Sequence, residues 1–269
     1  MKWTKQTKRV ILVILAFLIL ACAFVVYLEL IHKQSSVERF EQASPQSNQA
    51  QTDATTPPSV ESESVDTSSA VSEPYQSPVD FQLLQESNPD IYAWLDIPGT
   101  DISYPLLQRS GDDAYYLTHD AEGKENQNGA LFTEATCNNL TFGDPVTVVY
   151  GHHMRSGLMF GQLQELYSDP ECFEKYPEIV IYLPDRELHF DVFASVPYDN
   201  RHILQNYDFS DRRTFRLFFD GVLAVRAIEA TFAEDTLVQA GDQVLILSTC
   251  LIGNRTNRFL VCAKLSNQE

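Results

Sequence analysis

The chain has 269 residues, of which 44% are hydrophobic, and a formal net charge of −18 at pH 7. This length allows one large domain or two small ones. The acidic balance argues against a nucleic-acid-binding protein, because a phosphate backbone needs clustered basic side chains and the C-terminal two-thirds carry no basic stripe. We interpret the many carboxylates as a solvated acidic surface.

The N-terminus is predicted to anchor the protein in a membrane. Residues 1–9 carry four basic side chains, and residues 10–28 form an uncharged apolar run long enough to cross the hydrocarbon core as a helix. The run continues past Ala21-Cys22-Ala23, which favours an uncleaved anchor at 10–31 over a signal peptide. Positive charge before the span favours a cytoplasmic tail and places everything after it outside the cell.

Residues 32–78 are predicted to be a disordered linker. This segment is rich in Ser, Thr, Gln, Glu and Pro and holds few large apolar residues, so it buries too little surface to offset the entropy of ordering. From about Val79 the composition becomes that of a folded domain, which we assign to residues 79–269. An anchor, a spacer and a globular head suit a protein that acts near a membrane surface.

The head is predicted to be mostly β. A short helix is expected around Phe81–Leu84, ending near Asn88, and helical spacing of apolar residues favours two further helices at 158–166 and 209–219. Many short strands separated by turn residues indicate a closed or nearly closed β-barrel. The expected strands are 94–97, 102–107, 130–132, 146–150, 179–183, 188–196, 222–232, 244–248 and 259–265.

The cysteines do not suggest a structural metal or a disulfide framework. Five are present, at 22, 137, 172, 250 and 262, and none has zinc-like spacing to another cysteine or histidine. No Asp-rich loop has calcium-ligand spacing either. We therefore expect no metal and no cofactor, and we favour free thiols over a pairing of Cys137 with Cys172.

One apolar strand, 244–248, runs through Ser248 and Thr249 to a cysteine, Cys250. A nucleophile at the end of a strand is held rigidly while its side chain faces a cleft. A cysteine there is equally compatible with a small core residue. Alternation along the strand sends Ser248 and Cys250 to one face and Thr249 to the other. Both hydroxyl residues are candidate contacts for a substrate backbone, with Ser248 preferred.

A second strand, 146–150, leaves the predicted barrel through Gly151 and His152. A reactive thiol needs a partner that stabilises its thiolate and later moves a proton, and imidazole suits both tasks near neutral pH. His153 is placed behind the site. The histidines at 32, 119, 189 and 202 are assigned structural roles.

The third candidate segment opens the last strand with two arginines, Arg255 and Arg258. A fixed guanidinium near a thiol can hold a developing oxyanion or the carbonyl groups of a peptide. A solvated charge at a strand start is the alternative. Arg258 is preferred because the apolar strand follows it directly.

These blocks together resemble the signature segments of class B sortases. The resemblance rests on Tyr150-Gly-His152-His-Met154 with Met159-Phe160, on Leu247-Ser-Thr-Cys250 and on Arg258-Phe-Leu-Val261. Three opening segments, Asn88-Pro-Asp90, Trp94-Leu-Asp-Ile-Pro98-Gly-Thr100 and Tyr104-Pro105, are similar as well. The likeness covers residues 80–266 and keeps the blocks in the family's order.

The resemblance implies an eight-stranded sortase barrel with an N-terminal helix and a helix before the last strands. It implies that Cys250 is the nucleophile, His152 the acid/base and Arg258 the oxyanion-binding arginine of a cysteine transpeptidase. Some members carry an acidic residue two places after the cysteine, where this chain has Ile252, so an acidic assistant is not expected.

The implied substrates are secreted proteins with a C-terminal sorting signal, cleaved after a Thr through a thioacyl enzyme. The implied acceptor is a cell-wall amine or, alternatively, a pilin lysine. A cysteine peptidase on another fold and a catalytically inactive, membrane-tethered surface domain are the remaining alternatives. Papain-like peptidases place the cysteine before the histidine, the reverse of the order here.

Overall fold

The computed structural model describes residues 40–45, 75–234 and 237–268. The predicted cytoplasmic tail, the anchor at 10–31 and most of the predicted linker lie outside these ranges. Within them, no helix is both long enough and apolar enough to cross a membrane.

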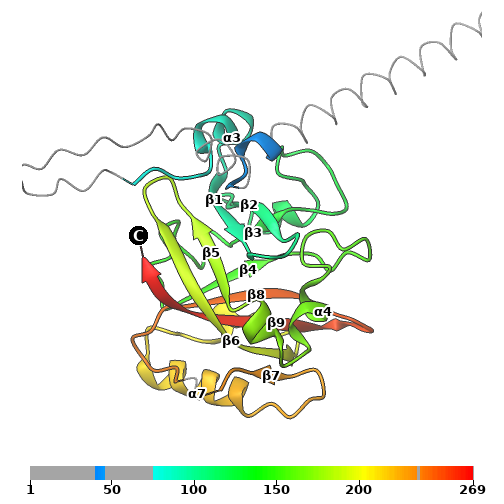
Figure 1. Ribbon diagram of the computed structural model, residues 1–269, viewed down its shortest axis with the longest axis vertical. Helices are drawn as coiled ribbons and strands as arrows, with labels where there is room; N and C mark the ends of the chain where they lie inside the picture. Colours follow the sequence, from blue (N-terminus) through cyan, green and yellow to red (C-terminus); the bar gives the residue numbers. More distant parts are fainter. Residues whose placement is uncertain (1–39, 46–74, 235–236, 269) are drawn as a thin grey trace, which may run out of the picture.

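Strands dominate the described head, as the alternating apolar pattern predicts (Figure 1). They are β1 (Ile91–Asp96), β2 (Ser103–Leu107), β3 (Leu131–Phe132), β4 (Val146–Tyr150), β5 (Glu178–Tyr182), β6 (Glu187–Tyr198), β7 (Thr231–Phe232), β8 (Val244–Leu251) and β9 (Asn254–Gln268).

Eight of these strands close into a barrel. Their order in the sheet is β5-β1-β2-β3-β4-β8-β9-β6, and β6 pairs again with β5 to complete the circle. The short β7 lies outside the circle and pairs only with β6. The prediction of an eight-stranded closed barrel is therefore confirmed, and closure leaves few free strand edges.

Two of the barrel's pairings are parallel, and one of them matters for the site. Strand β4 pairs with β8 from Val146↔Val244 to Tyr150↔Ser248. Strand β9 is antiparallel to β8 and also to β6, with which it forms a long ladder. Strand β8 is thus flanked by the two strands whose ends carry the candidate histidine and arginine.

The barrel interior is filled by side chains of one parity from every strand. On β8 these are Leu245 and Leu247, which are fully buried in the largest apolar cluster. Side chains of the other parity, such as Val244 and Ile246, belong to a second cluster shared with the helix after β6. Each strand of this region therefore has an inner and an outer apolar face, which explains its nearly continuous hydrophobic sequence.

That outer cluster is covered by α7 (Arg212–Leu223), at the lower end of the molecule in Figure 1. Phe215, Phe218, Phe219 and Val222 form its buried face, and each contributes about 1.5–3 kcal/mol relative to an exposed side chain. The helix begins at Asp211, whose carboxylate accepts a 2.9 Å hydrogen bond from the backbone N–H of Thr214.

A third cluster lies at the opposite end of the molecule under α3 (Phe81–Ser87) (Figure 1). This helix is the predicted N-terminal one, and Asn88 follows its last residue as the C-cap. Six residues of the predicted linker, 40–45, are also described here, and the fully buried Ala43 belongs to the same cluster.

The other helices between residues 75 and 268 of the described structure are short. They are the 3₁₀ helix η1 (Tyr115–Leu117), α4 (Leu163–Tyr167), α5 (Cys172–Lys175) and α6 (Ile203–Asn206). The prediction of a helix over 158–166 is wrong for its first half, because Met159 adopts a left-handed φ of 54° that ends any helical run. Only the part from Leu163 onward is helical.

The predicted strand over 222–232 is also wrong. Residues Val222 and Leu223 complete α7, because Val222 extends the buried stripe of Phe215, Phe218 and Phe219 at helical spacing. Only Thr231 and Phe232 form a strand, β7.

Candidate active site

Cys250 lies at the end of β8 with its thiol half-buried. Alternation along β8 puts it on the outer face of the barrel, the face of Val244 and Ile246, while Leu245 and Leu247 point inward. The strand ladder holds the backbone up to this residue and is interrupted by an irregularity immediately after it. The thiol is therefore presented from a rigid strand at a point where the sheet opens.

Arg258 is the direct partner of Cys250 across the β8–β9 ladder. Residues opposite each other in an antiparallel pair point to the same face, so the guanidinium shares the outer face with the thiol. Its Nη1 lies 4.0 Å from the Cys250 Sγ, the outer limit of an N–H···S contact, and 3.4 Å from the carbonyl oxygen of Asn257. A fixed positive charge thus stands beside the candidate nucleophile.

His152 reaches the site from the other side of β8. The last residue pair of the parallel β4–β8 ladder is Tyr150↔Ser248, and the Gly151 N–H continues it with a 3.2 Å hydrogen bond to the carbonyl of Ser248. His152 and Cys250 are each two residues beyond that pair. Cys250 and Arg258 therefore face each other across β8 and β9, and His152 follows the end of the neighbouring β4, although their catalytic roles stay predictions.

The glycine before His152 is required by close packing. A Cβ at Gly151 would lie 2.5 Å from Leu131 Cδ2 and 2.6 Å from Phe160 Cδ2, and both of those side chains are fully buried. The Phe160 N–H donates a 3.1 Å hydrogen bond to the carbonyl of His152. The chain therefore turns back on itself directly after the histidine and fixes its backbone.

The imidazole of His152 contacts a segment that the motif did not identify. Its Nε2 lies 2.8 Å from the carbonyl oxygen of Leu117, at the end of η1. This contact could not be found from residue types, since a backbone carbonyl has no sequence signature.

His153, which the sequence places behind the site, packs within the loop that follows β4. It forms an isolated antiparallel bridge with Met159, and its Nδ1 is buried without a hydrogen-bond partner in the described part of the chain. The Met159 N–H donates to the Tyr104 hydroxyl at 3.3 Å, so β2 also supports this loop. His153 therefore belongs to the structure around His152.

The two candidate substrate contacts lie on different faces. Ser248 shares the outer face with Cys250, whereas Thr249 has the parity of Leu247 and points into the barrel with 2% of its surface exposed. The Thr249 hydroxyl has no hydrogen-bond partner in the described residues. Ser248 is also buried, with 4% of its surface exposed, so a substrate contact of either hydroxyl stays a prediction.

Two further positions from the sequence analysis lie near the β8–β9 turn. Ile252 is exposed in the β8–β9 turn, and its N–H donates to the Gln164 side chain at 2.9 Å. The competing Arg255 lies on β9, at a position whose side chain is outside the described part of the structure. Our preference for Arg258 stays a prediction.

The other described histidines have structural partners. His119 stacks on Tyr115 with ring centroids 3.8 Å apart, and the His202 Nε2 lies 2.7 Å from a carboxylate oxygen of Glu134. His189 lies between two carboxylates, with Nδ1 3.0 Å from Glu178 and Nε2 3.0 Å from Glu187. These contacts agree with the structural assignment. His32 lies outside the described residues.

The remaining described thiols are held in their protonated form. Burial raises the pKa of the Cys172 thiol to about 11 and that of Cys262 to about 12. Burial also raises the pKa of Cys137. All four described cysteines are unpaired, so Cys250 is the one that combines access with a neighbouring cation.

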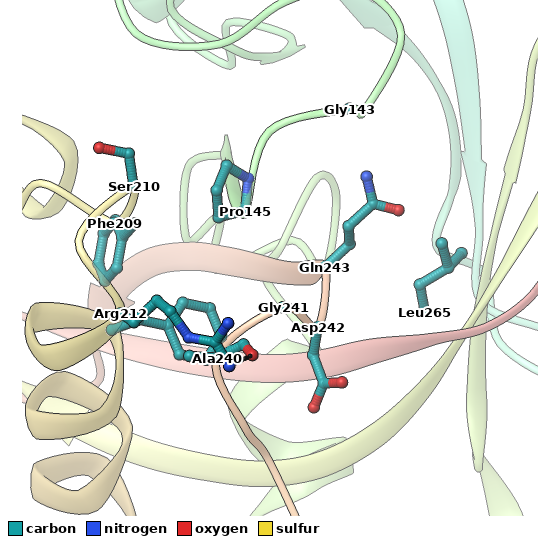
Figure 2. Close-up of a pocket in the computed structure, with 11 residues that line it drawn as sticks. Gly143, Pro145, Phe209, Ser210, Arg212, Ala240, Gly241, Asp242, Gln243 and Leu265 are labelled. Atoms are coloured by element: carbon teal, nitrogen blue, oxygen red, sulfur yellow. Dashed lines mark hydrogen bonds between the residues drawn. The ribbon is translucent and has the colours of Figure 1, made fainter.

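A well-formed pocket of 460 Å³ lies away from this chemistry, near the starts of β8 and α7 (Figure 2). Arg212 and Asp242 bring opposite charges to it, and the Arg212 guanidinium already donates to the carbonyl of Ala240 at 3.2 Å. The pocket lies before the start of β8, whereas Cys250 lies near the end of that strand. Nowhere in the described ranges do three or more His, Cys, Asp or Glu side chains gather in a way that could hold a metal ion.

Comparison with known proteins shows which family the chain resembles. The model of the sortase domain family matches residues 95–266, which contain His152, Cys250 and Arg258. The chain is 28% identical to sortase B of Listeria monocytogenes over 167 residues, which are 62% of this chain and 65% of that protein.

It is also 28% identical to sortase B of Staphylococcus aureus over 188 residues, or 69% of this chain and 74% of that protein. Its fold is similar to that of sortase B from B. anthracis in complex with AAEK1, with a TM-score of 0.61 and 28% identity over 72% of this chain and 88% of that one.

Proposed function

Because this chain belongs to the sortase family, we propose that it is a cysteine transpeptidase that cleaves a sorting signal and joins the new C-terminus to an amine. The observation that supports the proposal is the strand register, which pairs Cys250 with Arg258 and sets the end of β4, just before His152, beside β8. A cysteine peptidase on another fold is not supported, since the barrel and the family match agree.

In the proposed reaction the Cys250 sulfur attacks the backbone carbonyl carbon of a Thr in the sorting signal. Arg258, on the same face, stabilises the oxyanion of the tetrahedral intermediate. His152 gives a proton to the departing amine as the C–N bond breaks, which leaves a thioacyl enzyme. An acceptor amine then attacks the thioester, and the thiol is released as a new amide forms.

The surroundings of the thiol suit an extended peptide. Three segments around the site expose large apolar side chains, those of Leu117, Leu158 and Ile252. Ser248, beside Cys250, adds a hydroxyl on the same face. Apolar walls with a few placed polar groups are typical of sites that orient a ligand.

We propose a cell-wall amine as the acceptor and secreted proteins with a C-terminal sorting signal as donors. A pilin lysine is the alternative acceptor, with the same chemistry. An anchor at 10–31, with the catalytic head outside the cell, would place the enzyme where such donors arrive. The alternative without catalysis is an inactive, membrane-tethered surface domain.

The test incubates the full-length chain with peptides that carry Thr before the scissile bond, together with several amines. Mass spectrometry then detects adducts on Cys250 and ligated products. We expect a thioacyl adduct and amine-dependent product for the wild type, and neither for Cys250→Ala or His152→Ala. Product formation by Cys250→Ala would refute the transpeptidase mechanism. A folded wild type with a reactive thiol and no adduct would favour the inactive domain.

A further inference from the structure

The contact between His152 and Leu117 decides which ring nitrogen can exchange a proton. A carbonyl oxygen only accepts hydrogen bonds, so the 2.8 Å contact requires the proton on the His152 Nε2. Both the neutral and the charged imidazole then carry that proton. Only Nδ1 is left to gain or lose one, and the carbonyl of Leu117 is the ring's hydrogen-bond partner within the described residues.

The position of this carbonyl is set by the segment before β3. The N–H of Ala130 donates to the carbonyl of Tyr116 at 3.0 Å, and the N–H of Asn126 donates to that of Thr118 at 2.8 Å. These two bonds hold residues 126–130 against η1. The carbonyl of Leu117 lies between them and is aimed at the imidazole.

Gly129 lies against both partners of this contact, the Leu117 carbonyl and the His152 ring. It has a left-handed φ of +61°, and a Cβ there would lie 2.5 Å from the Tyr116 oxygen, 3.1 Å from the Leu117 oxygen and 3.1 Å from the His152 Cδ2. The absence of a side chain at 129 therefore allows the loop, the carbonyl and the ring to touch. A methyl group there would move the carbonyl, the ring or both.

The backbone of the histidine is held independently of its ring. Gly151 is tied to the carbonyl of Ser248 on β8, and the carbonyl of His152 accepts from the N–H of Phe160. The position two residues after the nucleophile holds Ile252, which has no charge to offer the ring. The imidazole is thus oriented by a backbone group, the carbonyl of Leu117.

We infer that Gly129 is a positioning residue that, through the Leu117 carbonyl, fixes His152 with its proton on Nε2 and makes Nδ1 the proton-transferring nitrogen. The inference rests on the proposed transpeptidase function. Nδ1 takes the Cys250 thiol proton and gives it to the departing amine nitrogen when the C–N bond breaks. In the second half, Nδ1 takes a proton from the acceptor amine and returns it to the sulfur.

The test compares Gly129→Ala with Gly111→Ala in the full-length chain. Gly111 lies in the same long connection from β2 to β3 and has a similar φ of +85°, but a Cβ there meets nothing within 4 Å. Both variants therefore carry the left-handed strain of alanine, and only Gly129→Ala adds close contacts with Tyr116, Leu117 and His152. The difference between them measures the positioning effect.

Each variant is assayed with a Thr-containing peptide amide and with an aryl thioester of the same acyl group. The amide needs a proton on its leaving nitrogen, whereas an aryl thiolate leaves without one. We expect Gly129→Ala to lower kcat on the amide about 10–100-fold with KM little changed, as for a misplaced catalytic group. On the thioester we expect a smaller loss, because that substrate needs Nδ1 to take the thiol proton but not to protonate the leaving group.

NMR of the ¹⁵N-labelled histidine side chains supplies a readout that needs no substrate. We expect the neutral His152 ring of the wild type to carry its proton on Nε2. A proton on Nδ1 would overturn the inference even if Gly129→Ala failed to fold. Equal losses of Gly129→Ala on amide and thioester would also overturn it. If the wild type consumed neither substrate, the proposed function would fail, while the tautomer would still be measured.

Discussion

Replacing Arg258 by alanine is expected to slow peptide cleavage about 10²–10³-fold, the usual effect of losing one oxyanion donor. The residue pairs with Cys250 across β8 and β9, and its Nη1 lies 4.0 Å from the thiol sulfur. At that distance two unit charges interact by about 4 kcal/mol at an effective dielectric constant of about 20, and by about 1 kcal/mol in bulk water.

The half-buried setting of Arg258 places the effect toward the larger of these values. Since each 1.4 kcal/mol corresponds to about a tenfold change in rate, a loss of about 2.7–4 kcal/mol matches the expected 10²–10³-fold drop. Arg258→Lys keeps the charge without the planar fork and is expected to lose less than alanine does.

The assay is the steady-state kcat/KM of the full-length chain on a Thr-containing peptide. Arg213→Ala, which removes an exposed arginine on α7, is the matched control and is expected to keep wild-type activity. Wild-type turnover by Arg258→Ala, together with a large loss in Arg255→Ala, would refute the assignment and transfer the role to Arg255.

Three further outcomes are expected. At neutral pH, iodoacetamide should alkylate Cys250 well before Cys172 and Cys262, whose thiols are buried and have raised pKa values, and peptide mapping gives the order. Gly151→Ala should destabilise the fold by about 1–3 kcal/mol through overpacking, measured by urea unfolding. His189→Gln should destabilise the protein more at about pH 5.5 than at about pH 8.5.

The sign of the His189 effect follows from its surroundings. Burial opposes the charged ring, but hydrogen bonds to Glu178 and Glu187 outweigh it and raise the pKa of His189. The stabilisation is therefore fully present below the unfolded pKa of about 6.5 and is lost as pH rises through the higher folded value. A destabilisation by His189→Gln that is equal at both pH values would contradict this account.

The other two predictions have equally direct checks. Gly221→Ala, on the open face of α7, is the control for Gly151→Ala and should stabilise the protein by about 0.5–1 kcal/mol. A Gly151→Ala variant as stable as the wild type would mean that Leu131 and Phe160 can move aside. Early alkylation of Cys172 would mean that its pocket opens in solution.

Much of the barrel was predictable, because strands that are buried on both faces read as uninterrupted apolar runs. Strand β4 has the predicted bounds, Val146–Tyr150, while β8 continues past the predicted 244–248 and includes Cys250 itself. The errors lie where one local conformation decides the outcome. The left-handed Met159 stops a helix, and Val222 completes a helical face that its β-branched side chain argued against.

The site was predictable in its residue types and not in its assembly. Cysteine, histidine and arginine could be selected for their chemistry, but the parallel pairing of β4 with β8 joins segments that are not consecutive and has no local signal. The Leu117 carbonyl is a backbone group, and Gly129 has only a hydrogen atom where other residues have a side chain. Their roles depend on distances that a sequence does not encode locally.

The same pairing has a consequence for how the protein folds. Strands β4 and β8 are separated along the chain by β5, β6, α7 and β7, and β9 joins β8 only after the last part of the domain has been synthesised. Contacts between distant segments form late and make folding slow. Cys250 and Arg258 can meet early in the local β8–β9 hairpin, whereas Cys250 meets His152 only when β4 pairs with β8. A partly folded chain therefore carries a thiol without its histidine. The onset of thiol reactivity is a kinetic marker of barrel closure itself.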